Sequence, residues 1–230
     1  MVSEEEAKAT RTVAETAGKA IDASREFGSF ISKYTGGSLE QGLGIFEDKL
    51  RYMRWERQVR LMQRAQDFLS EIGIDGPTRQ VPMKIAIPLF QGASLEEDDE
   101  LQDRWATLLV NAADERSEVN VARIYISILE HLSAYEALLL DRIYSVPEKK
   151  IPQGIWTKKL PHEIIYKEPE GEDMKPHKEL ELALATLDQL RLITGNLTWS
   201  GMQLFERINQ TVLGRSFVNA CKLRSEKKAT

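Results

Sequence analysis

The sequence predicts a mainly α-helical protein with a small β-hairpin near its C-terminal end. Three observations support this fold class. Apolar residues recur at helical spacing along most of the chain, capping-box patterns precede several of these segments, and a proline-rich stretch separates them from a final short hairpin. We expect three parts: a long N-terminal helical hairpin over residues 1–77, a central helical bundle over 78–146, and a C-terminal part over 147–230.

The composition indicates a soluble protein from a reducing compartment. Hydrophobic residues make up 42% of the 230 residues, which is enough for a sizeable core. The single cysteine, Cys221, excludes an internal disulfide, and the acidic start of the chain lacks the apolar segment of a secretory signal peptide. We therefore expect a cytoplasmic location. The net charge of −5 argues against nonspecific nucleic-acid binding as the main role.

The N-terminal part is predicted to form two helices. Helical spacing covers residues 3–34, and two glycines then interrupt it. Ser38 and Gln41 form a capping-box pattern that opens a second helix, which continues to about Ile72. A helix of that length, on the order of 50 Å at 1.5 Å per residue, needs a partner in a compact domain. We expect it to pair with the first helix as an antiparallel hairpin.

Two features of these helices have alternative interpretations. The apolar segment over 27–34 could lie in a membrane surface, but its mixed charges favour packing within the protein or between helices. The second helix carries a row of arginines that resembles a nucleic-acid contact: Arg51, Arg54, Arg57, Arg60 and Arg64. Because Glu56 and Asp67 share the face of the last three, and Glu56 can pair with Arg60, a solvated ion-paired face is favoured.

The best-defined helix is predicted over residues 94–115. Ser94 and Glu97 form a capping box, and an acidic run follows over 96–100, where negative charge suits a helix N-terminus. Adjacent carboxylates on a helix diverge, so this run favours a solvated helix start over a metal site. One apolar face follows, with Trp105 expected as a core anchor: Leu101, Trp105, Leu108, Leu109 and Ala112.

Shorter helices are predicted on both sides of this segment. Residues 78–93 are expected to form a loop and a short helix with Pro82 at its start. A helical face begins at Val121, and Ser133 with Glu136 forms a further capping box before the helix that ends near Pro147.

The C-terminal part begins as an extended insertion over 147–177, with short strands expected at 154–156 and 164–166. A helix resumes from His177. Leu197, Thr198 and Trp199 are predicted to pair as a strand with residues 210–213, and a last short helix follows Gly214.

No cluster of residues predicts a reaction. His162 and His177 lack the companions that zinc spacing requires, and the pair of glycines over 42–44 is too weak a pattern for a phosphate loop. Cys221 is interpreted as a buried small residue and not as a nucleophile. We therefore expect no enzymatic activity, no catalytic, cofactor-binding or metal-binding residues, and no cofactor.

Several segments resemble a known family. The sequences LQDRWATLLVNAADE over 101–115, ILEHLSAYEALLLDRIY over 128–144 and TVLGRSFVNAC over 211–221 are similar to the bacterial abortive infection alpha (Abi-alpha) and DUF4393-type proteins. The order of the upstream segments agrees, so the resemblance spans most of residues 40–222. It implies a cytoplasmic, mostly helical protein associated with defence against phage, and it carries over no catalytic residues.

The C-terminal part also resembles a winged-helix module. Winged helices commonly bind DNA, but the helix over 178–192 has Glu179, Glu181 and Asp188 against Lys178 and Arg191, a poor balance for phosphate contact. A packing or protein-contact module is therefore favoured.

We expect a non-enzymatic, abortive-infection-type defence protein that acts through macromolecular contacts. Its N-terminal helices are the expected surface for a protein partner or for self-association, and a homo-oligomer is expected. Two alternatives remain open, although nucleic-acid and membrane contacts are disfavoured: a winged-helix DNA-binding regulator, and a membrane-acting effector that inserts the segment around 27–34.

Overall fold

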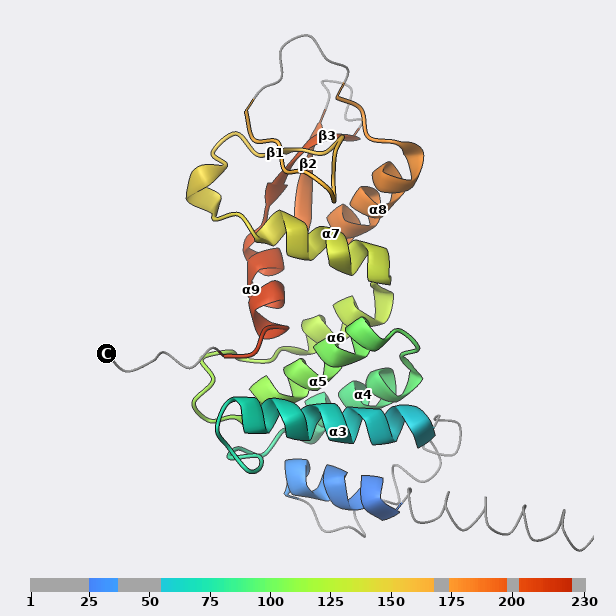
Figure 1. Ribbon diagram of the computed structural model, residues 1–230, viewed down its shortest axis with the longest axis vertical. Helices are drawn as coiled ribbons and strands as arrows, with labels where there is room; N and C mark the ends of the chain where they lie inside the picture. The colour runs from blue at the N-terminus through green and yellow to red at the C-terminus, as the bar shows by residue number, and fades with distance from the viewer. Residues whose placement is uncertain (1–24, 37–54, 168–173, 198–202, 225–230) are drawn as a thin grey trace, which may run out of the picture. The chain divides into compact units, whose positions relative to one another are not determined.

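The computed structural model describes residues 25–36, 55–167, 174–197 and 203–224 of the chain (Figure 1). The protein is mainly helical and has one small three-stranded antiparallel sheet, which confirms the predicted fold class. The chain divides into two compact units, one formed by residues 1–126 with 223–230 and the other by 127–222. The three-part division expected from the sequence stays a prediction.

The first unit consists of helices packed around α5. Its labelled helices are α3 (Trp55–Glu71), α4 (Met83–Leu95) and α5 (Asp99–Ala113), and residues 25–35 form a further helix. α5 packs against both α3 and α4. α6 (Arg123–His131) follows after a short connection.

Trp105 lies at the centre of this unit's core, as predicted. Its side chain is 1% exposed, and the predicted apolar face of α5 (Leu101, Leu108, Leu109 and Ala112) is buried with it. Gly92 of α4 lies directly against the indole ring: a Cβ atom placed on this glycine would come within 2.4 Å of Cη2 of Trp105. α4 therefore approaches α5 closely because this position has no side chain.

An aromatic cluster connects the helix over 25–35 to α4. The ring of Phe90 contacts those of Phe27, Phe30 and Tyr34, with centroid separations of 5.9 to 6.5 Å and steeply inclined planes. Edge-to-face contacts of this kind are favourable in addition to the burial of the rings. The prediction that the apolar segment over 27–34 packs within the protein agrees with this cluster. The turn and most of the predicted N-terminal hairpin, including Ser38 and Gln41, lie outside the described residues.

The predicted start of the central helix at Ser94 is wrong. α4 continues through Ser94 to Leu95, and α5 begins at Asp99, where the side chain of Asp98 accepts a hydrogen bond from the amide of Leu101 at 2.9 Å. Both sites have a capping sequence, but the Ser94 side chain is buried inside the apolar face of α4, where it forms no cap. Asp98 lies at the polar boundary and takes that role.

The second unit combines helices with the sheet. Along the chain it contains α7 (Ala134–Tyr144), the 3₁₀ helix η1 (Glu148–Lys150), β1 (Ile155–Trp156), α8 (Lys178–Gln189), β2 (Ile193–Leu197), β3 (Gln203–Gln210) and α9 (Val212–Ala220). β3 is the central strand and pairs antiparallel with both β1 and β2. The Ser133–Glu136 capping box is present as predicted, and the short strand predicted at 154–156 is found at 155–156. The strand predicted at 164–166 is reduced to an isolated bridge between Ile165 and Trp156.

The hairpin differs in register from the prediction. β2 begins at Ile193, which pairs with Gln210, and Leu197 pairs with Gln203. Residues 211–213 do not belong to the strand, because the Thr211 side chain accepts a hydrogen bond from the amide of Gly214 and caps α9. The last helix therefore starts at Val212, before Gly214. Thr198 and Trp199 lie outside the described residues, and the winged-helix description stays a prediction.

Candidate functional site

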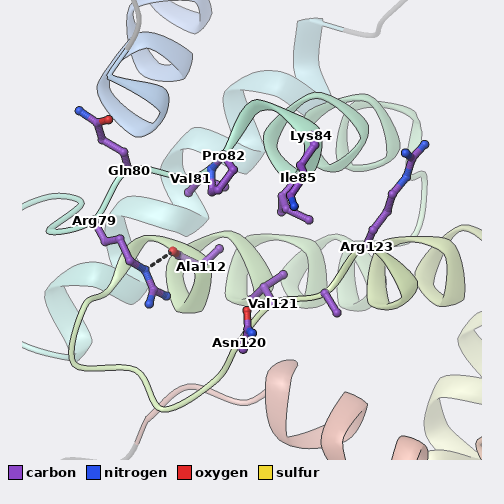
Figure 2. Close-up of a pocket in the computed structure, with 11 residues that line it drawn as sticks. Arg79, Gln80, Val81, Pro82, Lys84, Ile85, Ala112, Asn120, Val121 and Arg123 are labelled. Atoms are coloured by element: carbon purple, nitrogen blue, oxygen red, sulfur yellow. Dashed lines mark hydrogen bonds between the residues drawn. The ribbon is translucent and has the colours of Figure 1, made fainter.

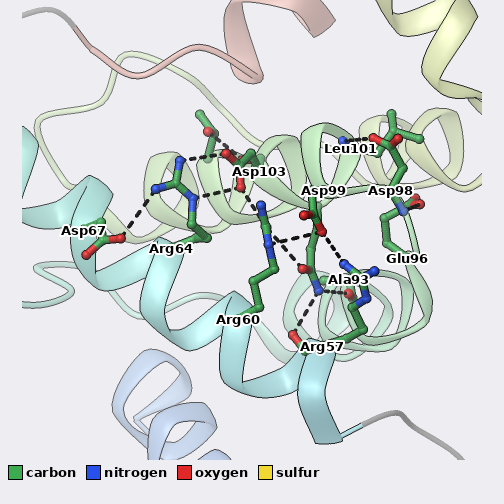
Figure 3. Close-up of polar contacts among 12 residues, drawn as sticks. Arg57, Arg60, Arg64, Asp67, Ala93, Glu96, Asp98, Asp99, Leu101 and Asp103 are labelled. Carbon is green, nitrogen blue, oxygen red and sulfur yellow. Dashed lines mark hydrogen bonds and ion pairs between the residues drawn. The ribbon is translucent and has the colours of Figure 1, made fainter.

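The arginine row of α3 faces the acidic start of α5 (Figure 3). We name this group the arginine–aspartate cluster; it comprises Arg57, Arg60, Arg64, Asp99 and Asp103. Arg57 pairs with Asp99 at 2.5 Å, and Asp103 accepts from Arg60 at 2.8 Å and from Arg64 at 2.6 Å. The cluster joins two helices whose pairing residues lie about forty positions apart in the sequence.

A buried glutamine lies beneath this cluster. The Gln102 side chain is 0% exposed and donates from Nε2 to the carbonyl oxygens of Arg57 and Ala93, each at 2.9 Å. Its Oε1 atom accepts from Arg60 at 3.2 Å. One amide thus connects α3, α4 and α5, and its satisfied hydrogen bonds make its burial tolerable.

Asp103 stays ionised over a wide pH range. Burial alone would raise the pKa of this carboxyl group, but the hydrogen bonds and positive charges of Arg64 and Arg60 outweigh burial and lower the pKa below its ordinary value. The same hydrogen bond to Asp103 raises the pKa of Arg64. The contact between Asp103 and Arg64 therefore favours the charged forms of both side chains.

The predicted ion-paired arginine face is correct in kind, and Arg64 does contact Asp67 of the same helix at 3.4 Å, but the other pairs are made with α5. The predicted partner of Arg60 was Glu56 on its own helix, whereas Arg60 pairs with Asp99 and Asp103 on α5. Within the acidic run over 96–100, Asp99 is exposed and also pairs with Arg57 and Arg60 of α3. Arg51 and Arg54 lie outside the described residues. The matching spacings, 57–60–64 and 99–103, are the sequence pattern that could have indicated this pairing.

The other residues singled out in the sequence have structural roles. His177 caps α8, since its Nδ1 atom accepts a hydrogen bond from the amide of Leu180 at 3.3 Å. His162 and His177 line one hollow beside α7 and α8, together with Glu179. Within the described ranges, no group of three histidine, cysteine or acidic side chains could hold a metal ion. Cys221 is buried, as expected, and the glycines over 42–44 lie outside the described residues.

A basic pocket in the first unit was not anticipated from the sequence (Figure 2). It has a volume of about 630 Å³ and lies among the segment before α4, the first turn of α4, the end of α5 and the start of α6. Three cationic side chains, Arg79, Lys84 and Arg123, line it. Its apolar wall consists of Val81, Pro82, Ile85, Ala112, Val121 and Ala122, and two amides, Gln80 and Asn120, complete it.

The three cations of the basic pocket differ in their hydrogen-bond partners. Arg79 donates to the carbonyl oxygens of Ala112 and Asn111 at 3.0 and 3.1 Å, where it neutralises the C-terminal end of α5. Lys84 and Arg123 are exposed and form no hydrogen bond or ion pair with another described residue. One local feature of the sequence indicates the pocket: the first turn of α4, after Pro82, carries a lysine where an acidic residue would be usual.

Comparisons with known proteins place the chain in a family. No curated protein and no solved structure matches it. Among the helices in the described part of the chain, none is long and apolar enough to cross a membrane. A family model described as abortive infection alpha matches residues 56–200, which is more than half of the chain and includes the arginine–aspartate cluster and the basic pocket. The chain belongs to the abortive infection alpha family.

Proposed function

We propose that this protein is a phage-defence protein of the abortive-infection type, and that it acts through contacts with another macromolecule without catalysing a reaction. Membership of the abortive infection alpha family supports the first half of this proposal. The second half rests on how the structure uses the side chains that are chemically capable of catalysis.

One observation supports the proposal that the protein is not an enzyme: the acidic, histidine and cysteine side chains named below stabilise the fold. Asp99 and Asp103 neutralise the arginines of α3, and Glu136 belongs to a capping box. His177 caps α8, and Cys221 is buried in the second unit. A catalytic group must converge with others on a substrate, whereas these groups are committed to helix ends, helix pairs and the core.

The proposed contact surface is the N-terminal segment, through which the protein would bind a protein partner or a second copy of itself. A chain that lacks residues 1–24 tests this surface, and it keeps every described core residue of the first unit, the first of which is Phe27. This surface also suits a homo-oligomer, which light scattering on the full chain would detect.

DNA binding through the second unit is the less favoured alternative. If the second unit bound DNA as a winged helix does, α8 would face the DNA. The exposed positions of α8 include two acidic residues, Glu179 and Glu181, and one lysine, Lys178. The exposed Leu182 cannot contact a phosphate by charge. DNA affinity comes largely from cations that neutralise phosphates. Fluorescence anisotropy with duplex DNA should therefore show no binding even at low salt, and salt-sensitive binding would favour this alternative.

The membrane alternative requires the segment around 27–34 to leave the protein core. Phe27, Ile31 and Tyr34 are all buried there. Liposome flotation of the full chain should therefore recover the protein in the unbound fraction. Flotation that depends on residues 1–36 would support membrane action instead.

A phage challenge tests the proposed function. Cells that express the full chain should plate phage at lower efficiency than cells with an empty vector. The single variants His162→Ala, His177→Asn and Cys221→Ala should keep this protection, because asparagine can also cap a helix and the other two changes remove only reactive groups. Loss of protection in any of them, with unchanged thermal unfolding, would indicate catalysis.

A further inference from the structure

We propose that the basic pocket binds a small organic phosphate of nucleotide size. The volume of about 630 Å³ lies within the range of roughly 300–1,000 Å³ found for small-molecule sites. The pocket has a cationic side and an apolar wall, and an organic phosphate needs both. This inference does not depend on the proposed role in defence.

The charged side of the pocket suits a phosphate group. Lys84 and Arg123 form no ion pair with another described residue, and none of the described lining residues is acidic. In the view of Figure 2 these two side chains lie toward one end of the pocket, while Arg79 and Asn120 lie toward the other. Arg79 is already occupied by carbonyl oxygens of α5, so Lys84 and Arg123 are the cations left for the ligand.

The ends of two helices also favour a phosphate group in this pocket. The lining residues Pro82 and Lys84 belong to the start of α4, and Ala122 and Arg123 to the start of α6. α4 has no side-chain cap, and neither helix has an acidic residue in its first turn. The positive ends of both helix dipoles therefore lie at a pocket whose described lining has no acidic residue, which favours an anion.

The opposite wall suits the nonpolar part of an organic phosphate. Val81, Ile85 and Val121 are buried and line the pocket, so they present a fixed apolar surface. The polar groups at its rim, Gln80 and Asn120, can donate or accept hydrogen bonds. A nucleic-acid strand is less suitable, because the large arginine row of the same unit is already neutralised by Asp99 and Asp103.

Calorimetric titration of the full chain tests the proposal with AMP, ATP, adenosine, inorganic phosphate and an oligothymidylate as probes. We expect AMP or ATP to bind and adenosine not to bind. The double variant Lys84→Gln/Arg123→Gln should weaken nucleotide binding at least about tenfold, as expected when charge-assisted contacts are lost. Ala122→Trp, which fills the pocket without changing charge, should also abolish binding.

The matched control is Arg25→Gln/Lys178→Gln, which removes the same two charges from exposed positions outside the pocket. This control should bind within about twofold of the unmodified chain, because isolated surface charges contribute little. Four results would overturn the proposal: no binding of either nucleotide, equal binding by the Lys84/Arg123 variant, binding of adenosine or of inorganic phosphate alone, or an oligothymidylate that binds more tightly than every nucleotide.

Discussion

At the residue scale, the first unit depends on positions where one side chain, or its absence, fixes the approach of two helices. Gly92 and Gln102 are two of them. Gly92 gives space to Trp105, and Gln102 uses its whole amide to connect three helices. Neither role follows from local sequence, because each depends on a neighbour that belongs to another helix.

Gly92→Ala should destabilise the protein even though alanine favours a helix. The added Cβ atom would lie 2.4 Å from Cη2 of Trp105, a buried ring with little room to move. Overpacking costs about 1–3 kcal/mol and the helix preference returns about 1 kcal/mol, so we expect a net loss of up to about 2 kcal/mol in urea unfolding.

Gly76→Ala is the control for this variant. Its Cβ atom would meet only the flexible end of Lys33, at 3.1 Å, so its free energy of unfolding should change little. A Gly92→Ala protein as stable as the unmodified chain would show that α4 and α5 do not rely on this close contact.

Asp103→Asn should reduce stability by on the order of 1–2 kcal/mol at neutral pH, because it removes a charge that faces two arginines. The folded pKa of Asp103 lies below its ordinary value of 3.8, so its contribution is present above that value and is lost as the pH falls through the folded pKa. The difference between the two proteins should therefore be constant near pH 7 and shrink below about pH 4.

Urea unfolding at several pH values measures this difference. Asp67→Asn serves as the control, because Asp67 is 58% exposed and contacts Arg64 at 3.4 Å. It should have a smaller effect at every pH. A difference for Asp103→Asn that persists at low pH would mean that its cause is not the carboxylate charge.

At the element scale, helix ends and strand register are set by caps. Two capping sequences compete between residues 94 and 99, and the buried face of α4 decides between them by continuing through Ser94. In the second unit, Thr211 ends β3 and starts α9, which fixes where the hairpin must pair.

Asp98→Ala should cost about 1 kcal/mol, the usual loss for an N-cap, because the amide of Leu101 loses its acceptor. Ser94→Ala should be neutral or slightly stabilising, since the buried Ser94 hydroxyl group has no hydrogen-bond partner among the described residues. Thermal unfolding of the two variants compares them directly. The reverse order would mean that the helix starts at Ser94.

Tyr144→Phe should destabilise the second unit by about 1–2 kcal/mol, because its hydroxyl group donates to the carbonyl of Leu192 at 2.5 Å and accepts from the amide of Thr211 at 2.9 Å. Burial raises the pKa of this phenol, so the loss should not depend on pH between 5 and 9. Tyr166→Phe, at a position 48% exposed, is the control and should unfold like the unmodified chain. Equal stability of the two variants would contradict the bridging role.

At the scale of the whole molecule, the features that the sequence predicted correctly are those that depend on the spacing of nearby residues. The Ser133–Glu136 box, the buried face around Trp105 and the short strand at 155–156 all follow from patterns within a few residues. The hairpin register was wrong because it depends on Thr211, whose amide is held by Tyr144 from 67 positions away. The basic pocket was missed because three separate stretches of the chain form it: 79–85, the end of α5 at Ala112, and 120–123.

The measurement that tests the proposed function most directly is the number of phage released per infected cell. We expect the full chain to lower this number relative to an empty vector. A chain that lacks residues 1–24 and keeps the unfolding temperature of the full chain should release phage like the empty vector, whereas one that lacks residues 225–230 should protect fully. Equal phage release with the full chain and the empty vector would contradict a defence role, and full protection without residues 1–24 would contradict the proposed contact surface.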